Sequence, residues 1–124
     1  MAVRSLIVDD NAQFAAVSRT TLEGSELTIV GLAATGAEAL QRTEELRPEL
    51  VLLDIDLGEE SGLDVARRIA DRDTEDRPEI ILISAHPAED FVELVAESPA
   101  LGFIAKSDLS SGAVMALLRA AGRP

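Results

Sequence analysis

Residues 51–64 read VLLDIDLGEESGLD and combine the end of a strand, a carboxylate and the start of a helix. The apolar run at 50–53 suits a strand that is buried on both faces. Asp54 stands where this run stops, glycines bracket the loop at 58–62, and an amphipathic helix pattern follows. Open α/β sheets place ligand chemistry at the carboxyl ends of such strands. Taken alone, Asp54 is explained better by a turn, in which aspartate is common, so the rest of the chain decides its role.

The composition is that of one globular domain. The 124 residues suit a single core, and 47% of them are apolar. We therefore expect one domain over residues 1–124. The chain contains no cysteine, which excludes a disulfide framework and a thiolate metal site.

The formal net charge of −12 argues against nucleic-acid binding by this chain, because a phosphate backbone requires patches of Lys and Arg. The apolar run at 3–8 contains polar residues and ends in two aspartates, too early for a signal peptide or a membrane span. We expect a cytoplasmic protein with no membrane partner. Between Pro78 and Leu118 the only Lys or Arg is Lys106, and this isolated cation requires an explanation.

Strand-like and helix-like segments alternate along the chain. Thr35, with Glu38 three residues on, predicts a capping box at a helix start. Pro87 suits the first position of a helix, and Ser110 is expected to cap the last helix. The expected strands are 3–8, 27–32, 50–53, 80–83 and 101–104, with 27–32 at an edge. The expected helices are 11–23, 35–46, 63–70, 87–97 and 113–120, with a charged connection at 72–77. The apolar side of the first helix is expected to carry Phe14, Val17 and Leu22.

This alternation predicts an α/β fold with a five-stranded parallel sheet covered by helices on both faces. Right-handed crossovers leave few topologies. Five units suit a flavodoxin-like, doubly wound (β/α)5 sheet in the order 2-1-3-4-5. Asp9-Asp10-Asn11-Ala12 stands where a glycine-rich phosphate loop would follow strand one, so a nucleotide or flavin site is not expected.

This strand order brings polar residues together at one edge of the sheet. Asp9 and Asp10 end strand one, Asp54 ends strand three, Ser84 ends strand four and Lys106 follows strand five. Neighbouring strands are roughly 4.8 Å apart, so three carboxylates converge beside a hydroxyl and an ammonium. Like charges at such a distance are unfavourable unless neutralised, and Mg²⁺ suits a site of few carboxylates and several waters.

A metal-bound carboxylate, a hydroxyl and a lysine meet the needs of phosphoryl transfer. The metal and the lysine spread the charge of the transferred group, and a carboxylate can act as the nucleophile to form an aspartyl phosphate. Each residue alone has an ordinary explanation, a surface lysine for Lys106 and a turn hydroxyl for Ser84. The coincidence of all five at strand ends favours the chemical interpretation.

Over its whole length the chain resembles the receiver domain of two-component response regulators. The resemblance rests on LIVDD at 6–10, LDI at 53–55 with SGL at 61–63, ISA at 83–85 and GFIAK at 102–106. These motifs are modest singly and specific in this order and spacing.

The resemblance implies a role for each residue of the predicted site. Asp54 is the phosphoacceptor, and Lys106 binds the phosphoryl group. Asp9, Asp10 and Asp54 hold Mg²⁺, Asp9 often through water, together with the main-chain carbonyl of Asp56. The resemblance further implies that Ser84 and Phe103 form the switch pair.

Some positions depart from the family pattern. Leu57-Gly58 replaces the usual Met-Pro, and Phe103 replaces the commoner Tyr. Phe103 is therefore expected to be largely buried near the fourth helix, because its ring has no hydroxyl to satisfy. Ser107 replaces a proline that follows the lysine in a cis peptide, and we expect a cis bond between Lys106 and Ser107 here too. His86 is expected to be a surface residue at the entry to a helix.

The sequence thus predicts a signalling switch rather than an enzyme acting on other substrates. A sensor histidine kinase or phosphotransfer protein would phosphorylate Asp54, and the resemblance places its contact on the first helix, at Phe14, Ala15 and Ser18. The face made by helix four, strand five and helix five would then change towards an output domain or protein, and a phosphorylation-dependent homodimer is a further expectation. The acidic residues of this face favour a partner that presents Arg or Lys. They are Glu89, Asp90, Glu93, Glu97 and Asp108.

Two alternatives remain open at this stage. One is a receiver-like interaction module that works without phosphorylation. The other is a metal-dependent phosphatase of the haloacid dehalogenase type, with Asp54-Ile55-Asp56 as its Asp-x-Asp motif. That class carries the motif on its first strand, whereas strand one here ends in adjacent aspartates.

Overall fold

The computed structural model describes residues 2–71 and 77–122, and it contains the expected parallel sheet. Five strands lie in the order β2-β1-β3-β6-β7, and every neighbouring pair is parallel. This is the predicted 2-1-3-4-5 order, with β2 at an edge as expected. The strands of the sheet are β1 Val3–Val8, β2 Leu27–Ala33, β3 Leu50–Asp54, β6 Glu79–Ser84 and β7 Gly102–Ala105.

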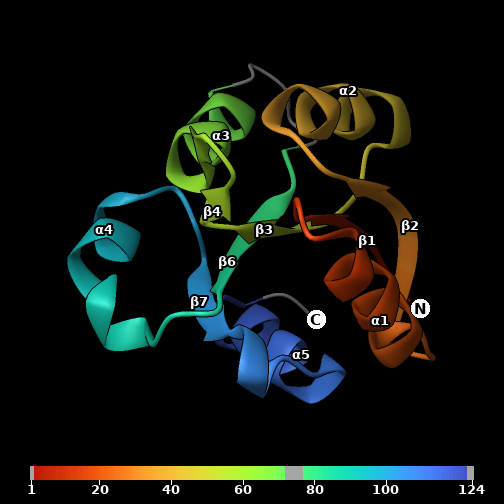
Figure 1. Ribbon diagram of the computed structural model, residues 1–124. Helices are drawn as coiled ribbons and strands as arrows, with labels where there is room; N and C mark the ends of the chain where they lie inside the picture. Colours follow the sequence, from red (N-terminus) through yellow and green to blue (C-terminus); the bar gives the residue numbers. More distant parts are fainter. Residues whose placement is uncertain (1, 72–76, 123–124) are drawn as a thin grey trace.

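Helices cover both faces of the sheet (Figure 1). One core lies between the sheet and α2, α3 and α4, and a second lies between the sheet and α1 and α5. The helices are α1 Ala12–Leu22, α2 Gly36–Leu46, α3 Gly62–Ala70, α4 Val92–Glu97 and α5 Ser111–Ala120, with short 3₁₀ turns η1 Ala88–Asp90 and η2 Lys106–Asp108.

The central strand β3 explains why both faces need a cover. All of its residues are buried, and successive side chains point to opposite faces. Leu50 and Leu52 belong to the core under α1 and α5, whereas Val51 and Leu53 belong to the core under α2 and α3. An uninterrupted apolar run is therefore what this position requires.

The predicted helix caps are present. The Thr35 hydroxyl accepts a hydrogen bond from the Glu38 N–H at 3.1 Å, and Ser110 accepts one from the Ala113 N–H at 3.0 Å. The Glu38 carboxylate reaches back to the N–H of Ala34, one residue before the cap. These local bonds satisfy N–H groups that have no partner within the helix.

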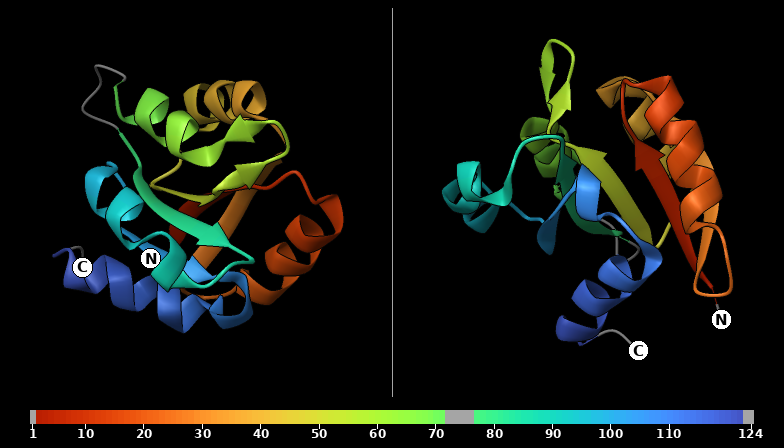
Figure 2. Two further views of the ribbon diagram at one scale, coloured as in Figure 1. Left: turned by 60° about the vertical axis from the view of Figure 1, so that its left-hand side comes forward. Right: turned by 60° about the horizontal axis from the view of Figure 1, so that its bottom comes forward.

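The segment after β3 is more regular than the expected loop. Strands β4 Asp56–Leu57 and β5 Glu60–Ser61 form an antiparallel hairpin, which projects from the body of the molecule in the right-hand view of Figure 2. Gly58 takes a φ of 63° at the turn, a conformation that glycine adopts without steric cost. The glycine thus forms a tight turn in place of an open loop.

The prediction of one helix over 87–97 was wrong. The carbonyl of Pro87 accepts a hydrogen bond from Asp90 in a 3₁₀ turn, and α4 begins only at Val92. Phe91 between them has φ −126° and ψ 7° and packs on the core beside Phe103. The Phe91 ring is partly buried on this core from a non-helical backbone, and α4 itself buries no residue, so little packing holds 87–97 in one continuous helix.

The apolar side of α1 also differs from the prediction. Val17 is 57% exposed, and Ala15, Ser18 and Leu22 are the buried residues, with Phe14 half-buried. A four-residue spacing from Ser18 to Leu22 keeps these two on one side of the helix, while Val17 lies off that side. The buried side of α1 thus carries the small residues Ala15 and Ser18 beside Leu22. The charged connection predicted at 72–77 lies mostly outside the described residues.

Candidate phosphoacceptor site

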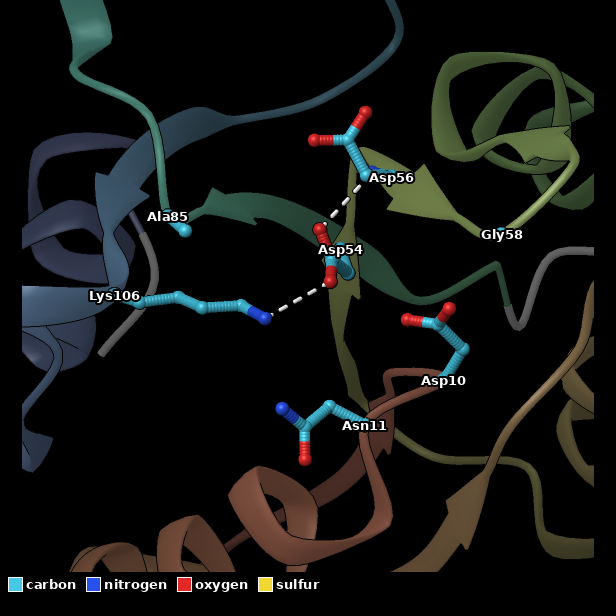
Figure 3. A pocket seen from close by; sticks show the side chains of 7 residues that line it. All are labelled: Asp10, Asn11, Asp54, Asp56, Gly58, Ala85 and Lys106. Carbon is cyan, nitrogen blue, oxygen red and sulfur yellow. Dashed lines mark hydrogen bonds and ion pairs between the residues drawn. The ribbon is translucent and has the colours of Figure 1, made fainter.

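The predicted polar residues meet at the carboxyl edge of the sheet. Asp9 directly follows β1, Asp54 is the last residue of β3, and Lys106 directly follows β7. An open cavity of about 690 Å³ lies over this edge. Figure 3 shows the Lys106 side chain reaching across it to Asp54. The residues that line the cavity are Asp10, Asn11, Asp54, Asp56, Gly58, Ala85 and Lys106.

Lys106 pairs with two buried carboxylates at once. Its Nζ lies 2.8 Å from Asp9 Oδ2 and 3.0 Å from Asp54 Oδ2. The side chains are nearly inaccessible, with exposed fractions of 17% for Lys106, 0% for Asp9 and 4% for Asp54. Water therefore screens these charges little, and the lone cation of this part of the sequence is accounted for.

Backbone N–H groups fix the second oxygen of each carboxylate. Asp9 Oδ1 accepts a hydrogen bond from Asn11 N–H, and Asp54 Oδ1 accepts one from Asp56 N–H, both at 2.9 Å. Bonds that reach two residues along the chain are typical of aspartate at turns. Each carboxylate is thereby oriented with Oδ2 towards Lys106.

Gly62 allows the chain to pass close to the end of β3. Its N–H donates to the Ile55 carbonyl, and a Cβ placed on it would lie 2.0 Å from the Asp54 carbonyl oxygen. No side chain fits this contact. The glycine lets α3 begin directly beside Asp54. The β4–β5 hairpin, which precedes α3, therefore lies next to the cavity.

The three aspartates can hold a metal ion. One carboxylate oxygen from each of Asp9, Asp10 and Asp54 lies within 4.8 Å of the others. Asp9 Oδ2 is buried and receives no hydrogen bond of good geometry from the described residues, so Lys106 offsets its charge without fully satisfying it as an acceptor. An oxygen-only donor set with an incompletely satisfied buried acceptor fits a hard divalent cation.

The surroundings shift the acidity of both partners. Burial raises the pKa of Asp54 from 3.8 to about 6, with Asp9 adding to the rise, while the Asp56 N–H and the Lys106 ammonium oppose it. Burial acts to lower the pKa of Lys106, but its contacts with Asp9 and Asp54 outweigh this effect, so the pKa is raised. The lysine stays charged at neutral pH, and Asp54 is mostly ionised there.

Asp56 does not add its carboxylate to the cluster. Its side chain is 62% exposed and lies 3.8 Å from His86 Nε2, and Figure 3 shows it turned away from Asp54. His86 is 63% exposed, in keeping with the predicted surface position. Both residues stand at the mouth of the site.

The predicted switch residues lie beside the cavity rather than in it. Ser84 is fully buried, and its hydroxyl accepts a hydrogen bond from His86 N–H at 3.0 Å. Ala85 rather than Ser84 lines the cavity. Phe103 is packed against Phe91, with ring centroids 5.7 Å apart. It lies next to α4 as expected but is only partly buried, so the prediction of large burial was too strong.

The prediction of a cis peptide bond between Lys106 and Ser107 was wrong. No cis peptide bond occurs in the described residues, and Lys106 still reaches Asp54. The 3₁₀ turn η2, closed by a hydrogen bond from Leu109 N–H to the Lys106 carbonyl, redirects the chain after β7. The flexible four-carbon stem of the lysine spans the remaining distance.

Two further residues contribute to the site and had no assigned role in it. Asn11 lines the cavity and caps α1 by accepting from Phe14 N–H, and the Phe14 ring centroid lies 4.4 Å from Lys106 Nζ. An Asp-Asp-Asn run ahead of a helix was the available signal for Asn11. The spacing of Phe14 indicated only an apolar helix side. Ala15 and Ser18, expected on the contact surface for a kinase, are buried and cannot form it.

Comparisons with known proteins show the family and agree with the fold. Residues 5–116 match the response regulator receiver domain. A chain described as the signal receiver domain of the response regulator NarL from Mycobacterium tuberculosis has a TM-score of 0.80 at 30% identity, covering 98% of this chain and 97% of that one. A LuxR-family two-component response regulator from Aurantimonas sp. SI85-9A1 has a TM-score of 0.82 at 26% identity, covering 99% and 88%.

The curated relatives are longer proteins. A Pseudomonas aeruginosa protein described as a transcriptional regulator is 34% identical over 111 residues, which are 90% of this chain and 53% of that protein. The Escherichia coli DNA-binding transcriptional activator EvgA is 26% identical over 115 residues, 93% of this chain and 55% of that protein. This chain thus spans about half the length of these two relatives.

The chain belongs to the response regulator receiver domain family. The fold and the family match are those of the receiver domains of two-component response regulators. Across the two described ranges, none of the helices has the length and apolar character that a membrane crossing needs.

Proposed function

We propose that this chain is a phosphorylation-dependent switch of a two-component system, with Asp54 as the phosphoacceptor. One observation carries the proposal. Asp54 stands at the end of the central strand, open to the cavity, with Lys106 Nζ 3.0 Å from one oxygen and two more aspartates beside it. This places a nucleophile, a cation and candidate metal ligands around one point.

The transfer would proceed by direct displacement. A carboxylate oxygen of Asp54 forms a bond to phosphorus while the P–N bond of a donor phosphohistidine breaks, and the departing imidazole keeps that electron pair and takes up a proton. Because the pKa of Asp54 is about 6, the carboxylate is mostly in its nucleophilic form at neutral pH. The Lys106 ammonium is placed to neutralise the oxygens of the arriving group.

Mg²⁺ is the proposed cofactor. Asp9, Asp10 and Asp54 would hold it through carboxylates, together with the main-chain carbonyl of Asp56. When bound, the ion would offset the negative charge shared by the aspartates and the phosphoryl oxygens. The buried and incompletely satisfied Asp9 Oδ2 supports this assignment.

The proposed response to phosphorylation involves Ser84 and Phe103. Ser84 would exchange its hydrogen bond from His86 N–H for one to the phosphoryl group, and the partly buried Phe103 would move further inward. Phe103 lines a groove of about 580 Å³ over β7 and α5. A shift of its ring would therefore alter that groove and bias an existing two-state equilibrium.

The face made by α4, β7 and α5 is the proposed output surface. Val92 and Leu94 are exposed on α4 at 62% and 44%, which offers apolar contacts. The surrounding charge is negative, so we propose a downstream domain or protein that presents Arg or Lys, with a phosphorylation-dependent homodimer as the alternative. The exposed acidic residues are Glu89, Asp90, Glu93, Glu97 and Asp108.

The contact with a sensor histidine kinase or phosphotransfer protein is proposed for the outer side of α1. Since Ala15 and Ser18 are buried, the contact shifts to Phe14 and the adjoining Leu109. This surface adjoins Lys106, whose ammonium pairs with Asp54. We further propose a cytoplasmic location, a single domain over residues 1–124 and no direct contact with nucleic acid or membrane.

Intact-mass measurement with acetyl phosphate tests the proposal. The wild-type protein should gain a single phosphoryl adduct in the presence of Mg²⁺ and none after chelation, and Asp54→Asn should gain none. An adduct retained in Asp54→Asn contradicts the assignment. Steady hydrolysis of a phosphate ester such as p-nitrophenyl phosphate would favour the phosphatase alternative, which the position of Asp54 on the third strand of the chain does not support.

A further inference from the structure

The Lys106 side chain lies between two cavities. On one side is the acidic cavity that contains Asp54. On the other is a cavity of about 140 Å³ between α1 and the β7–α5 connection, lined by Lys106, Phe14, Val17 and Leu109 among others. The ammonium is 4.4 Å from the Phe14 ring centroid and about 3 Å from its two carboxylate partners. An aromatic face and two carboxylates therefore enclose the cation.

The ring is tied to the same carboxylate that pairs with the lysine. Phe14 N–H donates to the Asn11 side chain at 3.0 Å, and Asn11 N–H donates to Asp9 Oδ1 at 2.9 Å. Asp9 Oδ2 in turn lies 2.8 Å from Lys106 Nζ. This connected set of contacts fixes where α1 presents the ring relative to the ammonium.

We propose that Phe14 is a positioning residue for Lys106. The face of an aromatic ring attracts an ammonium through its quadrupole, and the attraction grows when the cation is poorly hydrated, as it is for this mostly buried lysine. A lysine stem has many rotamers, and the ring favours those that hold Nζ beside Asp54. The consequence for phosphoryl transfer rests on the proposed function, whereas the positioning itself does not.

A plain apolar wall would make a different prediction. If Phe14 only filled space beside the lysine stem, leucine would serve nearly as well and the ring itself would be dispensable. Comparing Phe14→Leu with Phe14→Tyr separates the two cases, since tyrosine keeps the aromatic face. Val17→Ala is the matched control, because Val17 lies on the same helix and lines the same cavity but offers no π-face.

The experiment measures the Lys106 side chain by NMR and the phosphorylation of Asp54 by acetyl phosphate in Mg²⁺. The Lys106 ε-methylene group, followed by NMR relaxation, should be ordered in the wild type, Phe14→Tyr and Val17→Ala, and should become more mobile in Phe14→Leu. The maximal rate of phosphorylation should fall about 2- to 30-fold in Phe14→Leu, with the half-saturating Mg²⁺ concentration unchanged. The maximal rates of Phe14→Tyr and Val17→Ala should stay within about 2-fold of the wild-type rate. Such a difference is smaller than the loss expected from removing a desolvated cation–π contact.

The outcomes separate this proposal from the proposed function. A wild-type rate in Phe14→Leu, or an equal loss in Phe14→Leu and Phe14→Tyr, overturns the positioning role. If the wild-type protein takes up no phosphoryl group, the proposed function fails and the NMR comparison decides alone. A Lys106 side chain as ordered in Phe14→Leu as in the wild type then overturns the proposal, and order that is lost with leucine and kept with tyrosine upholds it.

Discussion

Replacing Asp54 with asparagine should stabilise the metal-free protein at neutral and alkaline pH. The native pKa of about 6 lies above the ordinary value of 3.8, so the native state binds this proton more tightly than the unfolded state. Stability from this group is therefore full below pH 3.8 and is lost as the pH rises through the interval from 3.8 to about 6. Asparagine does not ionise and avoids that loss.

The size of the effect follows from the same shift. At 1.36 kcal/mol per pKa unit, the rise corresponds to about 3 kcal/mol well above pH 6. The stability gain of Asp54→Asn over the wild type should be about half as large near pH 5 and close to zero near pH 3. The near-complete burial of the Asp54 side chain, 4% exposed, means that solvent screening reduces this little. The figure is an upper bound, because asparagine loses part of the contact with Lys106.

Urea unfolding followed by far-UV circular dichroism measures this difference, since the chain has no Trp or Tyr to report by fluorescence. Wild type, Asp54→Asn and the control Glu59→Gln, an exposed acid of the hairpin, are compared with a chelator at pH 4, 5 and 8. The gain of Asp54→Asn should grow with pH and shrink when Mg²⁺ is added. A gain that is constant across pH, or a loss at pH 8, would refute the reasoning.

Three further substitutions test other parts of the account. Asp10→Asn should weaken Mg²⁺ binding, measured by titration calorimetry, far more than Glu59→Gln does, and equal effects would mean that the metal site is misplaced. Gly62→Ala should destabilise the fold by about 3 kcal/mol or more in urea unfolding, because its Cβ would lie 2.0 Å from the Asp54 carbonyl oxygen; unchanged stability would contradict that contact. Phe103→Ala should cost about 1–3 kcal/mol, less than the 3–5 kcal/mol of a fully buried ring, and a cost at the upper figure would show that the ring is buried more deeply in solution.

The sheet and the meeting of the acidic residues could be predicted because strong local signals determine them. The apolar run of β3 suits a strand buried on both faces, and strand order then brings Asp9, Asp54 and Lys106 to one edge. The distances among these residues follow from the spacing of parallel strands. The chemical roles of the residues remain predictions.

The features that were missed depend on contacts between distant segments. The strands of the β4–β5 hairpin, Asp56–Leu57 and Glu60–Ser61, are too short to show an alternating pattern. The break before α4 depends on Phe91 packing against Phe103, and the trans turn after Lys106 depends on a 3₁₀ hydrogen bond. The position of Phe14 under Lys106 joins α1 to the end of β7, which helical spacing does not reveal.

The most direct test of the central claim is to locate the phosphoryl group. The protein is treated with acetyl phosphate and Mg²⁺ and reduced with borohydride, which converts an aspartyl phosphate to homoserine, and its peptides are then sequenced by mass spectrometry. The account predicts homoserine at position 54 and at no other aspartate. Homoserine at Asp10 or Asp56 with Asp54 unchanged would contradict it.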